Sequence, residues 1–251
     1  MNVLDRSQPP APSSIRPFRF PRIERRSLAN GLRILSARNG DLPLVTAELV
    51  LDAGAAAEPS DTAGLALLVA DALETGTHER TADQLAWDLE HLGVELEASA
   101  GWDAATVRMS VPRERLEPAM DLFAAIIRGA AFPEREFERL RQQQLATILQ
   151  RRKEPRALAA DEAVRFIFPA DVPYARPIVG TRHTVERIDR DDAERFYAAR
   201  FRPAAAALVL VGDLDADTAL AHAERVFGEW NGERPAPVDF DVRPAVERTT
   251  V

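Results

Sequence analysis

The sequence contains no cysteine, which excludes disulfide bonds, thiol catalysis and zinc held by cysteine ligands. Aromatic residues make up only 6% of the 251 residues and hydrophobic residues 46%, so we expect an aliphatic core. No apolar run approaches the roughly 18 residues that a membrane-spanning helix needs. The chain is long enough to bury a sizeable core, and we expect no membrane span.

A surplus of basic residues is also missing. Asp and Glu number 40 against 32 Lys and Arg, which gives a formal net charge of −8 and argues against nucleic acid as a partner. The first residues, MNVLDRSQPPAPSS, lack the apolar segment of a secretory signal. The sequence as written therefore favours a cytoplasmic location, with the periplasm or another compartment as the alternative if a signal has been removed.

Proline-rich ends flank a periodic middle. Five prolines fall within residues 1–22, which predicts an extended tail, and proline again interrupts residues 233–251. Residues 23–232 carry the strand and helix patterns of one folded domain. We expect residues 233–251 to be a linker and the start of a second half that this chain does not contain.

Alternating and helical periodicities follow one another along this middle part. Asn30-Gly31 predicts a hairpin turn, and Thr81 with Gln84 predicts a capping box that opens a helix closed by Gly93. Further strands are expected at 42–54, 94–100, 105–111 and 205–212, and helices at 64–76, 116–130, 133–153, 155–168, 191–200 and 215–230. This order predicts an α+β fold, a layered sandwich of helices on a mixed or antiparallel sheet.

The stretch GLALLVADALETGT, residues 64–77, carries one continuous apolar stripe, and Ser60 or Asp61 is expected to cap its helix. Asp71, Glu74 and His78 stand at i, i+3 and i+7, and two carboxylates with one histidine are a chemically possible metal site. However, Thr75-Gly76-Thr77 is expected to end the helix before His78. A polar helix end with a solvated histidine is the favoured alternative.

Several short motifs are specific when taken in order: Asp52-Ala53-Gly54, Gly64-Leu65-Ala66, Gly76-Thr77, Gly180-Thr181 and Gly212-Asp213. Together they resemble the pitrilysin/insulinase/mitochondrial processing peptidase family, over roughly Leu28 to Trp230. The resemblance implies one half of the processing-peptidase-like metallohydrolase fold, in which two similar halves enclose a chamber.

Active members of that family carry H-x-x-E-H on this helix; the histidines bind zinc and the glutamate polarises the zinc-bound water. The resemblance places the histidines at Leu67 and Asp71, the glutamate at Ala70, and a further glutamate ligand on the long helix at Thr147. A helper carboxylate would fall at Leu140. Asp71 alone is too few ligands for zinc, so we expect no catalytic residue, no metal site and no cofactor.

In the family, the strand that corresponds to residues 94–100 is an edge that pairs with the main chain of the substrate peptide. An Asn-Ala pair often stands there at the position of Glu97-Ala98. We treat Glu97, Ala98 and Ser99 as a possible peptide-binding edge strand, because strand addition needs only free backbone groups. The alternative is an ordinary strand that Glu95 and Glu97 protect from aggregation.

The resemblance implies a non-catalytic subunit, or half, of an insulinase-like zinc peptidase assembly. Its expected partners are a catalytic subunit that carries H-x-x-E-H, peptide substrates and its own missing second half. One alternative is a structural or interaction protein with no peptidase partner. Another is an active metallopeptidase that uses an unrecognised metal site.

Overall fold

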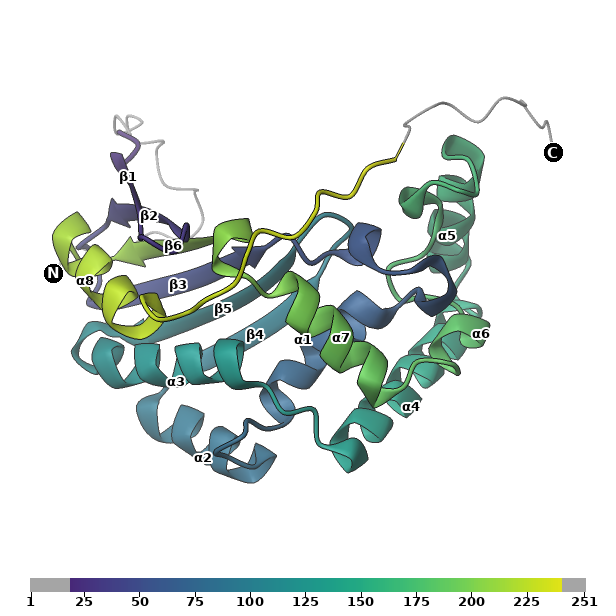
Figure 1. Cartoon of the computed structure of the whole chain (residues 1–251), viewed down its shortest axis with the longest axis horizontal. Helices are drawn as coiled ribbons and strands as arrows, with labels where there is room; N and C mark the ends of the chain where they lie inside the picture. Colours follow the sequence, from purple (N-terminus) through teal and green to yellow (C-terminus); the bar gives the residue numbers. More distant parts are fainter. Residues whose placement is uncertain (1–18, 241–251) are drawn as a thin grey trace, which may run out of the picture.

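The computed structural model describes residues 19–240, which fold around one six-stranded sheet with the order β1-β2-β6-β3-β5-β4 (Figure 1). Only β2 and β6 pair in parallel, and all other neighbours are antiparallel, so the predicted mixed sheet of an α+β fold is confirmed. The strands are β1 Ile23–Ser27, β2 Arg33–Arg38, β3 Leu44–Leu51, β4 Glu95–Ala100, β5 Ala105–Pro112 and β6 Ala206–Gly212.

The described residues contain eight α-helices: α1 Leu65–Ala72, α2 Ala82–Leu92, α3 Leu116–Gly129, α4 Glu134–Arg151, α5 Pro155–Ile167, α6 Arg182–Val185, α7 Arg190–Arg200 and α8 Ala216–Phe227. None of the helices in this part of the chain is long and apolar enough to cross a membrane. Of the expected tail and linker, residues 1–18 and 241–251 lie outside the described residues.

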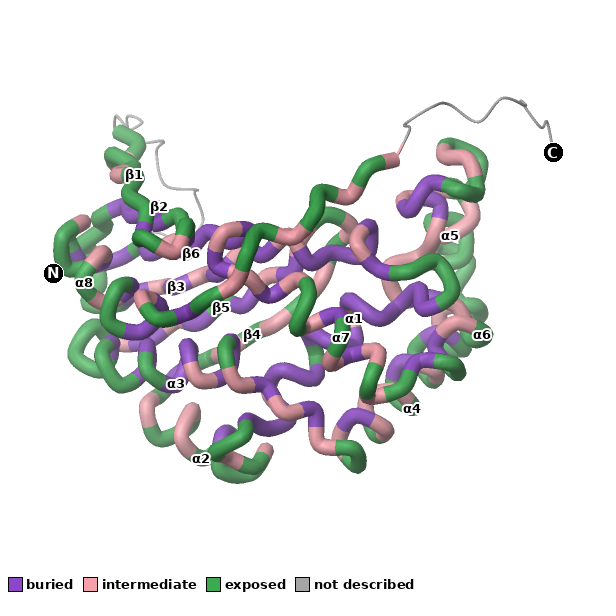
Figure 2. Tube along the Cα trace, in the orientation of Figure 1, coloured by how far each residue is buried: buried purple, intermediate pink, exposed green. Residues whose placement is uncertain are grey.

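The two faces of the sheet differ because apolar and polar residues alternate along its strands. Val45, Ala47, Leu49 and Leu51 of β3 are buried, as are the residues of matching phase on β5. This face packs on α1 and α3. The residues between them, such as Thr46, are only partly covered, and the burial colours alternate accordingly along the strands (Figure 2).

Two local predictions are confirmed by side-chain contacts. The hairpin at Asn30-Gly31 joins β1 to β2, and the Asn30 amide donates to the carbonyl oxygens of Phe227 and Trp230 at 2.7 and 2.8 Å. Thr81 and Gln84 form the predicted capping box at the start of α2. The short helix α6 was not predicted; a second capping box, between Thr181 and Thr184, starts it.

The predicted cap of α1 is wrong. Ser60 and Asp61 lie in a separate 3-10 turn, Ser60–Thr62, and the N-cap of α1 is Gly64 with a φ of +103°. No side chain caps the helix from the N-cap position itself. The carboxylate of Glu58 accepts the first backbone N–H groups instead, and this contact is described below.

Candidate functional site

The first turn of α1 is held by buried polar contacts from two other parts of the chain. Glu58 is only 5% exposed, and its two carboxylate oxygens accept hydrogen bonds from Gly64 N at 3.0 Å and Ala66 N at 2.9 Å. These N–H groups have no partner within the helix, so the carboxylate satisfies donors that would otherwise be buried unpaired. Burial raises the pKa of Glu58 to about 7, although the two N–H groups and the nearby Arg176 act in the opposite direction.

Helix α4, helix α6 and the loop before α6 hold the same turn from the other side. The buried Gln144 donates from Nε2 to Gly64 O at 2.9 Å and to Val179 O at 3.0 Å. The Thr184 hydroxyl donates to Ala63 O at 2.7 Å. Gly180 packs so closely that a Cβ atom there would lie 2.1 Å from Ala63 O. The position of α1 is therefore fixed by groups from three separate segments of the chain: residue 58, helix α4 and residues 180–184.

Beyond its first turn, α1 presents an open face. Leu67 is partly buried and Asp71 is exposed, and their i, i+4 spacing places them on one helix face; Glu74, in the 3-10 turn Leu73–Thr75 that continues α1, is partly buried. Ala70 lies off that face and is fully buried. The two positions that the family resemblance assigns to histidine are thus on the open face, whereas the position assigned to the catalytic glutamate is covered.

The fourth assigned position lies on α4, which packs against α1. Thr147 is exposed, and its hydroxyl donates to Gln143 O of its own helix at 3.1 Å. Leu140, at the position of the helper carboxylate, packs against the hydrophobic core. A leucine, an alanine and a threonine hydroxyl bound to its own helix do not fit the nitrogen and carboxylate ligands that zinc takes, so no catalytic step through zinc follows for this chain.

The alternative metal site at Asp71, Glu74 and His78 is not assembled. α1 ends at Ala72, and Gly76 with a φ of +151° turns the chain away. His78 N then bonds to Gly129 O, at the end of α3. Among residues 19–240, no group of three or more His, Cys, Asp or Glu side chains stands in an arrangement that holds a metal ion.

The open face of α1 is nevertheless electrostatically unusual. The surrounding protein raises the pKa of Asp71 to about 6, because the carboxylate is shielded from part of the solvent. It also raises the pKa of Glu74, first by burial and then by repulsion from Asp71. Within the described part of the chain, neither carboxylate has a basic partner in an ion pair.

Strand β4 lies at the edge of the sheet and pairs only with β5. Gly101 N donates to Ala104 O at 2.8 Å, which sets the phase of this antiparallel pair. Hydrogen-bonded and non-bonded positions alternate, so Glu95, Glu97 and Ser99 direct their backbone groups to β5. The backbone groups of the intervening residues, Leu96, Ala98 and Ala100, point outward, and in residues 19–240 nothing outside the sheet bonds to them.

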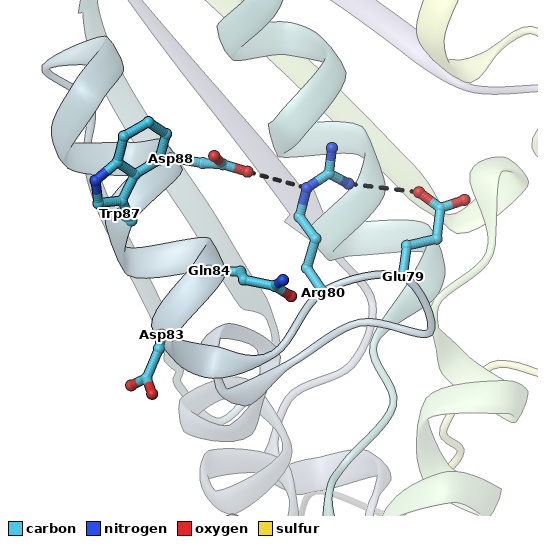
Figure 3. A pocket seen from close by; sticks show the side chains of 6 residues that line it. All are labelled: Glu79, Arg80, Asp83, Gln84, Trp87 and Asp88. Atoms are coloured by element: carbon cyan, nitrogen blue, oxygen red, sulfur yellow. Dashed lines mark hydrogen bonds and ion pairs between the residues drawn. The ribbon is translucent and has the colours of Figure 1, made fainter.

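A separate hollow of about 500 Å³ lies between α2 and the turn before it (Figure 3). Arg80 stands in its wall, and its charge is compensated by Asp88 at 3.0 Å and by Glu79 at 3.4 Å. The hollow shares no residue with the open face of α1 or with β4. Its ion pairs are a sufficient account of its polar lining, and we assign no function to it.

Sequence reasoning missed Glu58 and Gln144. One signal was available for Gln144: the buried residues of α4 are Phe137, Gln144 and Ile148, at i, i+7 and i+11. A lone amide in an apolar stripe indicates a buried hydrogen-bond partner. Glu58 carried no such signal, because it sits in a non-periodic segment before the helix that it caps.

Comparisons with known proteins agree with this geometry. The model of the insulinase family (peptidase family M16) matches residues 33–182, and that of the peptidase M16 inactive domain matches residues 187–251. An uncharacterized zinc protease of Rickettsia bellii is 28% identical over 83% of this chain and 52% of its own length. A non-peptidase homolog of Helicobacter pylori, YmxG, is 26% identical over 74% of this chain and 43% of its own length.

A crystal structure of a peptidase M16 inactive domain from Pseudomonas fluorescens superposes with a TM-score of 0.82 at 25% identity, over 89% of this chain and 54% of that one. The present chain thus spans about half the length of the curated relatives it matches. The family match covers most of the folded part, and the motif order and the anchored α1 agree with it. The chain belongs to the insulinase family, peptidase family M16.

Proposed function

We propose that this chain is a non-catalytic half or subunit of an insulinase-like zinc peptidase assembly, and that it helps to enclose and bind peptide substrates for a partner that carries H-x-x-E-H. The observation that carries the proposal is the contrast within α1. The helix is held in place by Glu58 and Gln144, yet Leu67 and Asp71 occupy the positions of the zinc-binding histidines. Helix α1 is therefore held firmly in position, although the residues on its open face do not supply the zinc ligands of active family members.

The outward backbone groups of β4 support the peptide-binding part of the proposal. Strand addition gains its affinity from main-chain hydrogen bonds, and Leu96, Ala98 and Ala100 supply donors and acceptors at alternate positions. The replacement of the family's frequent asparagine by Glu97 does not remove these groups, because the backbone of Glu97 faces β5.

The partner part of the proposal is supported by the two-half architecture that the family resemblance implies and by one relative. The two family models that match this chain cover one such half. One relative is described as a non-peptidase homolog, so members without peptidase activity are found among proteins similar to this one.

A native mass spectrum of the complex captured through this chain from its source cells tests the partner and the metal together. We expect a heteromer in which one zinc stays with a second chain that contains H-x-x-E-H. A zinc ion retained on this chain alone overturns the proposal. A stable partner without the motif favours the structural role instead.

A pair of proline variants tests peptide binding. Ala98→Pro removes an outward N–H but no sheet hydrogen bond, so we expect the fold to persist while peptide binding is lost. Glu97→Pro removes an N–H that is directed to β5, so we expect lower stability. The thermal midpoint reports the fold, and binding is followed by NMR titration with the capped peptide Ser-Thr-Ser-Leu-Ser-Thr-Ser. Unchanged binding by Ala98→Pro contradicts strand addition.

A further inference from the structure

Strand β1 forms the edge of the sheet opposite β4, and within residues 19–240 it pairs only with β2. The strand is exposed along most of its length (Figure 2). Leu28 N donates to Leu32 O at 2.9 Å at the adjoining turn, and this bond sets the phase of the β1–β2 pair. Because bonded and non-bonded positions alternate, the backbone groups of Ile23, Arg25 and Ser27 point away from β2.

These outward backbone groups can pair with an added strand. In the part of the chain that the structure describes, no turn or loop backbone group bonds to them. The Arg25 carbonyl accepts a hydrogen bond from Arg26 Nη1 at 3.1 Å. Arg26 is exposed, so a peptide N–H can take its place while the guanidinium returns to water. An edge with unpaired N–H and C=O groups is a template for another chain.

The β1–β2 hairpin is basic, although the whole chain has a formal net charge of −8. Three arginines and no acidic residue line a hollow of about 470 Å³ at this edge: Arg25, Arg26, Ser27, Arg33, Ile34 and Leu35. Arg26 lies 3.6 Å from Glu24, which also pairs with Arg22 at 2.9 Å. Among the described residues, no carboxylate forms an ion pair with Arg25 or Arg33. The edge therefore carries positive charge that the described residues do not balance.

The two free edges of the sheet differ in sign. Strand β4 carries Glu95 and Glu97 and no basic residue. An acidic segment is repelled by the side chains of β4 and attracted by those of β1. Charge therefore distinguishes an occupant of β1 from a peptide at β4.

Strand geometry also fixes where the acidic residues of an added strand would lie. A peptide residue that exchanges main-chain bonds with Arg25 projects its side chain to the same face of the sheet as Arg25. Two residues along the peptide, the next side chain on that face lies opposite Ser27. Ser27 is small and pairs with Arg33, whose guanidinium can extend over it. Carboxylates at positions i and i+2 of a peptide therefore suit Arg25 and Arg33.

We propose that the β1 edge binds an extended acidic segment of a partner protein, which adds to the sheet as a further strand with acidic residues opposite Arg25 and Ser27. This surface lies at the opposite edge from the peptide-binding strand proposed above, and it needs no peptidase chemistry. The free main chain favours a peptide over a nucleic acid or a membrane, because a peptide supplies both the donors and the acceptors of a strand.

The test uses the capped peptide Thr-Val-Glu-Thr-Glu-Val-Thr and two versions with Gln or Lys in place of both Glu residues, each titrated into the full chain and followed by NMR. At low salt the Glu peptide should bind roughly three- to tenfold more tightly than the Gln peptide, the gain expected of two exposed ion pairs. The Lys peptide should bind most weakly. High salt should remove these differences, and chemical shifts should change most at Ile23–Ser27.

Two double variants locate the preference. Arg25→Gln with Arg33→Gln removes both unpaired charges, and it should bring the Glu peptide down to the affinity of the Gln peptide. Arg152 and Arg156 are also exposed, but they lie where α4 meets α5, at the other end of the molecule from β1 (Figure 1). Arg152→Gln with Arg156→Gln makes the same change in net charge and should leave the preference unchanged.

Two N-methylated peptides test the strand pairing itself. A methyl group on the nitrogen of the second Glu blocks an N–H that faces β1, so binding should be lost. A methyl group on the nitrogen of the central Thr lies on the side away from β1, so binding should persist. Ala98→Pro, at the β4 edge, should bind the Glu peptide as the unmodified chain does.

Several outcomes overturn the proposal. Equal binding of the Glu and Gln peptides does so, as does a Glu preference that survives the loss of Arg25 and Arg33. Equal binding of the two N-methylated peptides leaves charge attraction without strand addition. Loss of binding in Ala98→Pro places the peptide at β4 instead.

Two further measurements distinguish other occupants of the edge. Displacement of the Glu peptide by vesicles of phosphatidylcholine and phosphatidylserine assigns the arginines to a membrane surface and overturns the proposal. Sedimentation velocity tests a second copy of this chain, whose β4 edge is acidic. Self-association that the Arg25→Gln, Arg33→Gln variant abolishes identifies that copy as the occupant and overturns the assignment to another protein.

Discussion

The first turn of α1 and the open face of the same helix differ sharply in how their surroundings constrain them. Around the first turn, Glu58, Gln144 and Thr184 bond to backbone atoms, and Gly180 permits a close approach. On the open face, Asp71 is exposed and has no basic partner among the described residues. The contacts that place the helix all involve its backbone or the residues just before it.

This comparison shows that the position of the helix and the chemistry of its face are physically separable. Backbone-directed hydrogen bonds and close packing do not depend on which side chain occupies Leu67 or Asp71. Loss of zinc ligands there removes a metal site without removing a fold contact. A chain can therefore keep the architecture of a peptidase half while its catalytic positions change.

The largest expected effect on stability comes from a substitution at Gly180, which packs against the residue before the N-cap of α1. Its φ is +74°, and a Cβ atom would lie 2.1 Å from Ala63 O, directly before α1. Gly180→Ala combines left-handed backbone strain with a backbone clash, and we expect a loss of roughly 3–5 kcal/mol in the free energy of unfolding. Urea denaturation followed by circular dichroism measures it.

Gly93→Ala is the matched control. Gly93 also has a left-handed φ, +65°, but a Cβ atom added at that position would meet nothing within 4 Å. The control should lose only about 1–2 kcal/mol, the cost of the backbone conformation alone. Equal losses in the two variants would show that the contact between Gly180 and Ala63 does not constrain the start of α1.

Much of the fold was predictable from sequence because it follows from local patterns. Alternation located β3, β4 and β5, and helical periodicity located α1 and α3. Asn30-Gly31 located the turn between β1 and β2, and Thr81 located the start of α2. The short helix α6 escaped prediction because four residues are too few to establish a period. The cap of α1 was wrong because Glu58 acts from outside the usual N-cap position.

The candidate site was less accessible from sequence. Motif spacing gave the positions of Leu67 and Thr147, but not that Ala70 is covered while Asp71 is exposed. The outward direction of the Ala98 backbone depends on the phase of the β4–β5 pair, which a single hydrogen bond beyond the strand reveals. The bonds of Gln144 and Thr184 to Gly64 and Ala63 join segments that are distant along the chain, and no local pattern contains that information.

The protonation of Glu58, whose carboxyl group holds the start of α1, should make the stability of the protein depend on pH. Burial raises the pKa of Glu58 from 4.5 to about 7, so the folded protein holds this proton more tightly than the unfolded chain. The resulting stabilisation is fully present below pH 4.5 and is lost as the pH rises through about 7. Asp71, raised from 3.8 to about 6, acts in the same direction. Glu138 and Asp215 have lowered pKa values and titrate below this window.

Urea unfolding between pH 5 and pH 7.5 measures this effect in the unmodified chain and in Glu58→Gln. We expect the unmodified protein to lose stability as the pH rises, with the share of Glu58 on the order of 3 kcal/mol at most. Glu58→Gln should be less stable at low pH but should show a clearly smaller decrease. Asp71→Asn, at an exposed residue, should change the slope much less. An identical slope in Glu58→Gln would mean that Glu58 is already ionised throughout this range.

The smallest expected effect on stability is at Thr147, the exposed position on α4 that the family resemblance assigns to a zinc-binding glutamate. Thr147 is exposed on α4, so Thr147→Glu should change the free energy of unfolding by no more than about 0.5 kcal/mol. The next residue, Ile148, is 5% exposed, and Ile148→Glu should cost on the order of 3 kcal/mol or more, because it buries a carboxylate without a partner.

The difference between these neighbouring variants measures whether α4 has an open face at Thr147. Both carry the same new charge on the same helix, so propensity and net charge cancel in the comparison. A small cost at Thr147 means that a glutamate fits there without refolding, and that the missing ligand reflects a lost function and not a packing demand. A cost at Thr147 as large as that at Ile148 would mean that Thr147 is part of the packed core. The position of α4 and the chemistry of its exposed face would then not be separable as they are for α1.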